Sequence, residues 1–147
     1  MNRVTRPALL LLAAIALAAC ASPTGETTPT QPPIEIVKTD GSEIGRLTLS
    51  ASAAGRLGIA TEAVAEERID GVDRTVIPYA ALLYDADGTT WAYTNPEGLL
   101  FIREPVTVDR IQGDLAILRA GPAVATLVVT VGGAELWGAE HGVGGGK

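Results

Sequence analysis

The chain has 147 residues and a single cysteine, Cys20, whose thiol could be acylated, oxidised or bound to a metal. It ends an apolar run over residues 8–19, and Arg3 and Arg6 precede that run. A basic start, a short apolar stretch and small residues before a cleavage point are typical of an export signal. About a dozen apolar residues are too few to cross ~30 Å of hydrocarbon as a helix. We therefore expect residues 1–19 to be an export signal.

The residues around Cys20 resemble a bacterial lipoprotein signal, because Leu17-Ala-Ala stands directly before the cysteine. The resemblance implies that Cys20 becomes the first mature residue and carries lipid on its sulfur and its new amino group. It also implies that the lipid anchors the chain in the cell membrane, on the extracytoplasmic face, which is the periplasmic side in a cell with two membranes. The alternative is an ordinary export signal whose last small residue is cysteine. With Cys20 lipidated, no thiol is left for a disulfide, a redox reaction or a metal.

Asp85-Ala-Asp-Gly places two carboxylates one residue apart before a glycine, as at the start of a calcium-binding loop. In the EF-hand pattern the third ligand would be Thr89, and position twelve, which requires a glutamate, is Pro96. We therefore interpret this segment as a polar hairpin turn and predict no metal ligand in it.

His141 is the only histidine, and it lies beside Glu140 at the start of a glycine-rich tail. A catalytic triad or a metal site needs several groups held rigidly together, so we interpret His141 as a solvated side chain. An acidic run around Gly71 contains Glu66, Glu67, Asp70 and Asp73. Paired carboxylates transfer protons only in a cleft that shifts their pKa values, so we interpret this run as a solvated loop.

Four aromatic residues, Trp91, Tyr93, Tyr84 and Phe101, fall on expected hairpin strands. We interpret them as cross-strand packing in a core, with a platform for a ligand as the alternative. None of these patterns supports an enzyme. The sequence predicts no catalytic residue, no metal and no cofactor.

The charge of the chain excludes one class of partner. Residues 1–19 hold two of the 11 basic residues and none of the 17 acidic ones, so the net charge of −6 becomes −8 when they are removed. Binding to nucleic acid needs clustered Lys and Arg, so no nucleic-acid partner is expected. Attraction to anionic lipids is disfavoured for the same reason, and membrane contact should come from the acyl chains.

Composition divides the chain into four parts. Residues 1–19 are the signal, and residues 20–33 form a tether rich in Pro and Thr, which cannot bury enough surface to become ordered. At ~3 Å per residue the tether reaches at most about 40 Å. Residues 34–139 form the globular domain, and residues 140–147 a flexible, glycine-rich tail.

Short apolar runs separated by turn residues in residues 34–139 predict an all-β domain, which is a small, mainly antiparallel barrel or sandwich with one short helix. That helix should span residues 51–57, with Ser50 as its N-cap and Gly58 as its C-cap. Residues 134–139 are expected to form one closing helical turn. Asn95-Pro-Glu-Gly predicts a type I turn. The expected strands are residues 34–37, 46–50, 59–64, 74–77, 80–84, 89–94, 99–109, 114–118 and 126–131, the last with Leu127, Val129 and Val131 on one face.

Two stretches resemble a known family. Residues 77–94, 101–108, 113–118 and 128–136 are similar, in order, to the C-terminal region of periplasmic adaptor subunits of tripartite efflux pumps, which are also called membrane fusion proteins. Residues 47–64 are similar to the segment by which many adaptors enter their barrel-sandwich domain. In those adaptors a long insertion separates the two stretches, whereas here residues 65–75 join them. The resemblance therefore covers only the membrane-proximal domain, which faces the inner-membrane transporter.

The combined expectation is a lipid-anchored, non-enzymatic extracytoplasmic domain that binds or modulates a membrane transporter, with contacts from loops such as 85–88 and 95–98. A complete adaptor role is not expected, because this chain lacks the insertion that holds the parts that reach an outer-membrane channel and form a ring. The main alternative is an envelope lipoprotein that binds a small ligand near Trp91 and Phe101. A hydrolase using His141 and a remnant without a present role are further alternatives.

Overall fold

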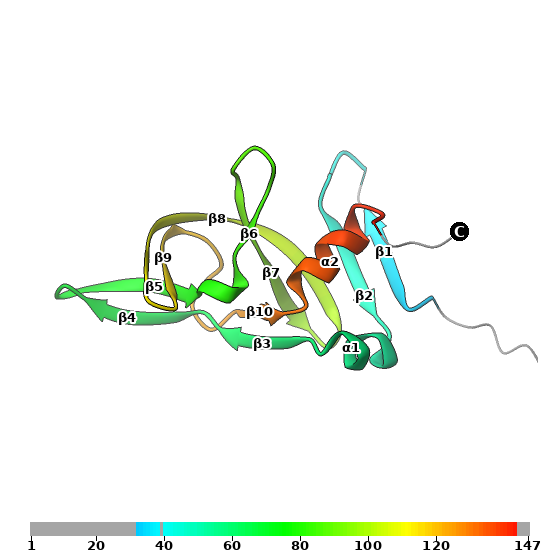
Figure 1. Cartoon of the computed structure of the whole chain (residues 1–147), viewed down its shortest axis with the longest axis horizontal. Coiled ribbons are helices and arrows are strands. Elements are labelled where there is room, and N and C mark those ends of the chain that lie inside the picture. Colours follow the sequence, from blue (N-terminus) through cyan, green and yellow to red (C-terminus); the bar gives the residue numbers. More distant parts are fainter. Residues whose placement is uncertain (1–31, 39, 144–147) are drawn as a thin grey trace, which may run out of the picture. The chain divides into compact units, whose positions relative to one another are not determined.

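The computed structural model describes residues 32–38 and 40–143 (Figure 1). The predicted signal, Cys20 and most of the predicted tether lie outside these residues. Residues 31–147 form a compact unit with its own hydrophobic clusters, which is the property of a domain that folds alone. Its elements are β1 (Ile34–Lys38), β2 (Gly45–Leu49), α1 (Ala51–Leu57), β3 (Ala60–Ala63), β4 (Ala65–Ile69), β5 (Val72–Pro78), the 3₁₀ turn η1 (Tyr79–Ala81), β6 (Leu83–Tyr84), β7 (Thr90–Glu97), β8 (Leu100–Gln112), β9 (Leu115–Ala120), β10 (Leu127–Val131) and α2 (Gly133–Glu140).

The strands form one curled antiparallel sheet, which confirms the predicted fold class. Its order is β3-β10-β7-β8-β9-β5-β4. The two ends of this path, β3 and β4, are adjoining pieces of one chain segment separated only by Val64, so the sheet curls back on itself. We call the strands of this path the curl. The remaining hairpin, β1–β2, joins the curl where β2 pairs with the first residues of β8.

Two hydrophobic clusters occupy opposite faces of the sheet. One lies inside the curl and draws on β5, β7, β8, β9 and β10, with Ala92 and Val128 among its members. The other packs β2, β7, β8 and β10 against the helices, and includes Tyr93 and Val129. Successive side chains of a strand point to opposite faces, so neighbours such as Ala92 and Tyr93 are both buried. We call β1, β2, α1 and α2 the end layer.

Helix α1 begins and ends as the sequence predicts. The Ser50 hydroxyl accepts a hydrogen bond from the Ala53 N–H at 3.2 Å, which satisfies one of the free donors of the first turn. At the other end Gly58 has a φ of +62°, the left-handed conformation that suits glycine. A second helix, α2, extends the single closing turn that was expected near residues 134–139, so the described part of the chain has two short α-helices rather than one.

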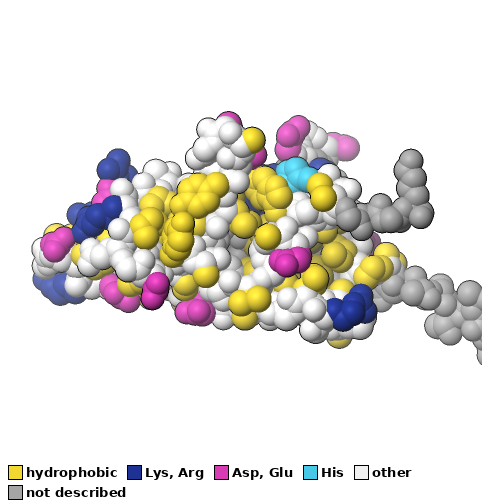
Figure 2. Space-filling view, in the orientation of Figure 1, with side chains coloured by type: hydrophobic (Ala, Val, Ile, Leu, Met, Phe, Trp, Pro, Cys, Tyr) yellow, Lys and Arg dark blue, Asp and Glu magenta, His cyan; other side chains and the backbone are white. Residues whose placement is uncertain are grey.

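The prediction that the acidic segment is a loop is wrong in one respect, because β4 and β5 pair there as a hairpin. Asp70 and Gly71 form its turn with φ values of +53° and +78°, the conformation that Asp-Gly favours in two-residue hairpins. Most of the side chains of β4 are exposed, so the strand carries little apolar alternation by which to recognise it. Figure 2 shows basic and acidic side chains gathered around this hairpin, where ion pairs join Arg68 to Asp73 and Arg110 to Asp70.

Three further expectations need correction. The turn predicted at Asn95-Pro-Glu-Gly lies later, because β7 continues to Glu97 and the Asn95 amide donates to the Leu100 carbonyl at 2.8 Å. In β10, Val128 and Val129 are both buried, in the clusters on opposite faces, and a register shift lies between Val129 and the exposed Val131. The segment expected as a strand from residue 80 begins with η1, and only β6 is extended.

Within residues 32–38 and 40–143, no helix is long and apolar enough to cross a membrane.

Candidate functional site

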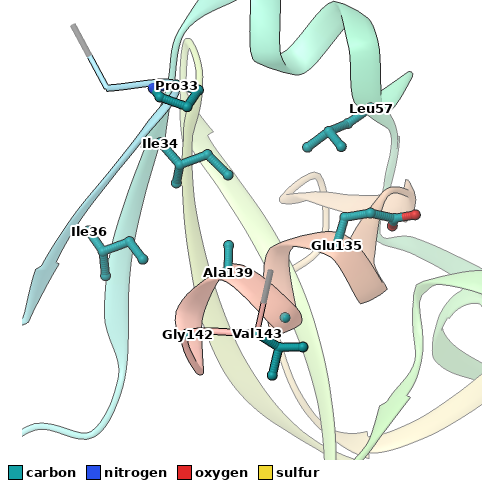
Figure 3. A pocket seen from close by; sticks show the side chains of 9 residues that line it. Pro33, Ile34, Ile36, Leu57, Glu135, Ala139, Gly142 and Val143 are labelled. Atoms are coloured by element: carbon teal, nitrogen blue, oxygen red, sulfur yellow. The ribbon is translucent and has the colours of Figure 1, made fainter. Parts of the chain in front are cut away.

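A groove of about 440 Å³ lies between β1, the end of α1 and α2 (Figure 3). This volume falls in the range of small-molecule pockets. Its walls are mainly aliphatic. The lining residues are Pro33, Ile34, Ile36, Leu57, Glu135, Gly138, Ala139, Gly142 and Val143.

The groove exists because α2 covers β2 but not β1. Leu136 of α2 is fully buried in the same cluster as Leu47 and Leu49 of β2. Strand β1 lies one position farther out, and in Figure 3 the side chains of Ile34 and Ile36 point from it toward α2. Ile36 remains 39% exposed. The hollow is therefore the uncovered part of the apolar face of the β1–β2 hairpin.

Small residues on the α2 side leave the space open. Gly138, Ala139 and Gly142 present at most a methyl group to the groove. A Cβ built on Gly142 would meet no atom within 4 Å, and its φ of +74° also favours glycine at this position. A larger side chain at Ala139, which is half-buried and lines the groove, is the simplest way to fill it.

Glu135 is the only charged residue in the lining, and it is exposed. An apolar groove with one carboxylate at its rim offers contact area and one point of charge recognition. It does not offer a nucleophile or a base paired with an acid, which acid–base chemistry requires.

A buried ion pair fastens α2 beside the groove. The carboxylate of Glu140 lies 3.2 Å from Nε of Arg103, and these side chains are 0% and 5% exposed. The same carboxylate accepts hydrogen bonds from the Gly45 N–H at 2.8 Å and from the Tyr93 hydroxyl. The end of α2 is thereby bound to β2, β7 and β8 at once. Glu140, the last residue of α2, is thus packed into the folded domain.

These contacts set the protonation states of the cluster. Burial by itself would raise the pKa of Glu140, but the Gly45 N–H, the Tyr93 hydroxyl and the charge of Arg103 outweigh it and hold the pKa below the ordinary value. Burial, followed by the hydrogen bond to Glu140, raises the pKa of the Tyr93 hydroxyl. Tyr93 is therefore a proton donor and Glu140 an ionised acceptor at neutral pH.

Arg103 also lies between two aromatic rings. Its guanidinium carbon is 4.2 Å from the centroid of Trp91 and 4.8 Å from that of Trp137. Trp137 also stacks with the ring of His141, with centroids 4.4 Å apart. Cation–π contacts of this kind stabilise a desolvated arginine. Arg103, Trp91 and His141 also border a second, more polar hollow of about 460 Å³ beside residues 41–44 and Asp85.

The residues singled out from the sequence are not brought together in one site. Asp85 and Asp87 bond within their own turn, where the Thr89 N–H donates to Asp87 at 2.9 Å and lowers the pKa of that carboxyl. Among the residues that the structure describes, no three His, Cys, Asp or Glu side chains are placed to hold a metal ion. Cys20 lies outside them.

The aromatic residues divide into two groups. Tyr93 and Phe101 are buried in the core, with Phe101 only 1% exposed, as cross-strand packing predicts. Trp91 is half-buried in the Arg103 stack, and Tyr84 is 56% exposed. The ligand-binding alternative predicted a pocket near Phe101, but this side chain is buried in the core and lines neither the groove nor the second hollow.

Sequence reasoning missed both the groove and the buried ion pair. The alternation of Ile34 and Ile36 was a sufficient signal for a strand, but it did not indicate which element would leave it uncovered. Arg103 and Glu140 are 37 residues apart, and no spacing rule links them.

Comparison of the chain with models of protein families, with curated proteins and with solved structures found no match. The resemblances to lipoprotein signals and to adaptor subunits therefore remain predictions from the sequence.

Proposed function

We propose that this protein is a lipid-anchored, non-enzymatic domain on the extracytoplasmic face of a membrane, where it binds a membrane transporter through the groove of its end layer. The observation that carries the proposal is the place where the chain enters the domain. Pro33 lines the groove, and only residues 21–32 separate it from Cys20. At ~3 Å per residue, an anchor at Cys20 would keep the groove within about 40 Å of the bilayer surface.

The composition of the groove supports binding rather than catalysis. Its wall is aliphatic, and its one carboxylate, Glu135, is exposed and has no basic partner in the lining. The kind of partner comes from the resemblance of residues 77–136 to the transporter-facing domain of efflux adaptors. The curled antiparallel sheet is compatible with that resemblance but does not by itself identify a partner.

The test begins with the full chain expressed in bacterial cells. Mass spectrometry of the N-terminal peptide should find Cys20 as the first residue, with its mass raised by acyl groups. Chemical crosslinking in membranes, followed by purification, should then recover a transporter subunit. An Ala139→Trp variant, which fills the groove, should lose this partner, while Val124→Trp, at an exposed site outside the groove, should keep it. An unmodified amino terminus, or equal recovery by both variants, would contradict the proposal.

A small apolar ligand is the second candidate, and the volume and lining of the groove favour it over the region near Phe101. It predicts that apolar compounds raise the melting temperature of the domain and that Ala139→Trp abolishes the increase. A panel of such compounds without any effect on the melting temperature would remove this candidate.

A further inference from the structure

We infer that the groove and the free edge of β1 accept an extended apolar segment of the partner protein as an additional antiparallel strand, with a basic side chain beside Glu135. This inference rests on the proposed binding function and names the chemistry of the partner. It depends on three features of the end layer: the backbone groups of β1, the side chains in the groove, and the charge at its rim.

The backbone of β1 offers unpaired groups on its outer edge. The Ser50 N–H donates to the Pro33 carbonyl at 3.0 Å, so these two residues form a hydrogen-bonded pair in the antiparallel register of β1 and β2. Such pairs alternate with non-hydrogen-bonded ones, so Ile34, Ile36 and Lys38 direct their N–H and C=O groups away from β2. Among the described residues, no other strand pairs with β1.

The groove provides the side-chain half of the interaction. Ile34 and Ile36, whose backbone groups point outward, are also the residues of β1 whose side chains line the groove. A strand added at this edge places every second side chain on the same face. Those side chains would enter the space between β1 and α2 and cover Ile36, Leu57 and Val143. Strand addition to an exposed edge, with alternate side chains in pockets, is an established mode of peptide recognition.

Charge defines one position of the partner segment. Glu135 is the only charged group in the lining and is exposed. A lysine or arginine on the partner would therefore find a complementary charge at the rim, whereas an acidic residue there would be repelled.

A peptide fits these observations better than the two other apolar occupants. An acyl chain could fill the groove, but it would leave the outward backbone groups of β1 without a partner. A second copy would have to pair β1 with β1 of its symmetry mate, since a closed dimer requires the same surface on both copies. The measurement of oligomeric state below tests that arrangement.

The test uses residues 31–147, which form a compact unit without the anchor. The probes are six fluorescein-labelled hexapeptides of alternating valine and threonine, each with lysine at a different position. Fluorescence anisotropy should show saturable binding of at least one peptide. Amide shifts in NMR spectra should centre on Ile34, Ile36, Lys38 and α2. Absence of saturable binding by all six peptides would overturn the inference.

Three variants separate strand addition from other modes. Lys38→Pro removes one outward N–H without changing the groove, and should weaken binding about tenfold, while Lys38→Ala should stay near the wild type. Ala139→Trp should abolish binding. Glu135→Lys should weaken binding of the best peptide about threefold and favour its glutamate analogue. Circular dichroism and urea midpoints of each variant check that the fold is retained.

The remaining outcomes also decide the question. Equal affinity of Lys38→Pro and Lys38→Ala would exclude strand pairing. Binding of oleate with no peptide binding would assign the groove to an acyl chain, and a dimer in analytical ultracentrifugation that is lost in Lys38→Pro would assign the edge to a second copy. Because the domain is tested without Cys20, a failure here is distinct from a missing lipid anchor or a missing transporter.

Discussion

The curl and the end layer contrast in how their edges and interiors are completed. In the curl, the path of strands ends in β3 and β4, which follow each other in the chain, and the interior cluster is made of aliphatic side chains alone. In the end layer, β1 has an open edge, the apolar face is only partly covered, and a buried ion pair fastens α2. An unpaired strand edge beside an uncovered apolar face is a site at which another chain can associate. In the function that we propose, the end layer is the binding region and the curl supports it.

The largest expected effect comes from breaking the ion pair of the end layer. Arg103→Met leaves Glu140 as a buried carboxylate without its cation, so we expect the free energy of unfolding to fall by about 3–5 kcal/mol. Urea denaturation followed by tryptophan fluorescence measures the change. Arg119→Met removes a mostly exposed partner of Asp109 and should cost no more than about 1 kcal/mol. Similar losses in the two variants would show that the buried pair has no special role.

A cavity in the curl should cost somewhat less and leave the groove intact. Ile77 is fully buried in the interior cluster, so Ile77→Ala should lower the free energy of unfolding by about 3 kcal/mol. Val72→Ala, at a half-exposed position of the same strand, is the control and should change stability little. Peptide affinity of the folded Ile77→Ala variant should equal that of the wild type. A tenfold loss of affinity would mean that the two regions are not independent.

The protonation of Glu140 should make the end layer sensitive to acid. Its pKa in the folded protein lies below the ordinary 4.5, so ionised Glu140 contributes stability that is present above pH 4.5 and is lost as the pH falls through the folded pKa. Between about pH 6 and about pH 3 the wild type should therefore lose more stability than Glu140→Gln. Urea midpoints of the two proteins across this range measure the difference in stability. The other carboxylates are present in both proteins, so their contributions cancel. Equal losses of stability in the wild type and in Glu140→Gln would contradict a lowered pKa of Glu140.

The smallest effect concerns the backbone of the loop between β9 and β10. Ala125 has a φ of +72°, a conformation that costs an alanine roughly 1–2 kcal/mol. Ala125→Gly should therefore raise the free energy of unfolding by about 1 kcal/mol after the entropy of glycine is subtracted. Thermal unfolding is sufficient to detect the change. Ala123→Gly, at a position where φ is not positive, is the control and should be destabilising. A loss of stability in both variants would contradict the claim that the backbone of Ala125 is strained.

The general fold was accessible from the sequence because its signals are local. Ser50 and Gly58 bracket α1, and Asp85-Ala-Asp-Gly joins β6 to β7 as a turn. The β4–β5 hairpin was missed although Asp70-Gly71 is a strong turn signal, because the flanking residues are mostly charged. The alternation predicted for β10 does not reach its last residue, because a register shift lies between Val129 and Val131.

The candidate site was much less accessible. Its residues come from the two ends of the domain, and each of them has an ordinary interpretation in its own segment. Ile34 and Ile36 resemble core residues of any strand, and Glu140 resembles part of a solvated tail. The lipid anchor at Cys20 and the transporter partner remain predictions that rest on resemblance.

The sequence by itself determined the all-β class, the capped helix α1 and most of the turns, because these depend on contacts between residues close in the chain. Only the tertiary structure decided that α2 covers β2 and leaves β1 open, and that Glu140 is bound by Gly45, 95 residues away, and by Arg103. Contacts of this kind depend on the packing of whole elements, and a linear pattern carries no record of which faces will meet.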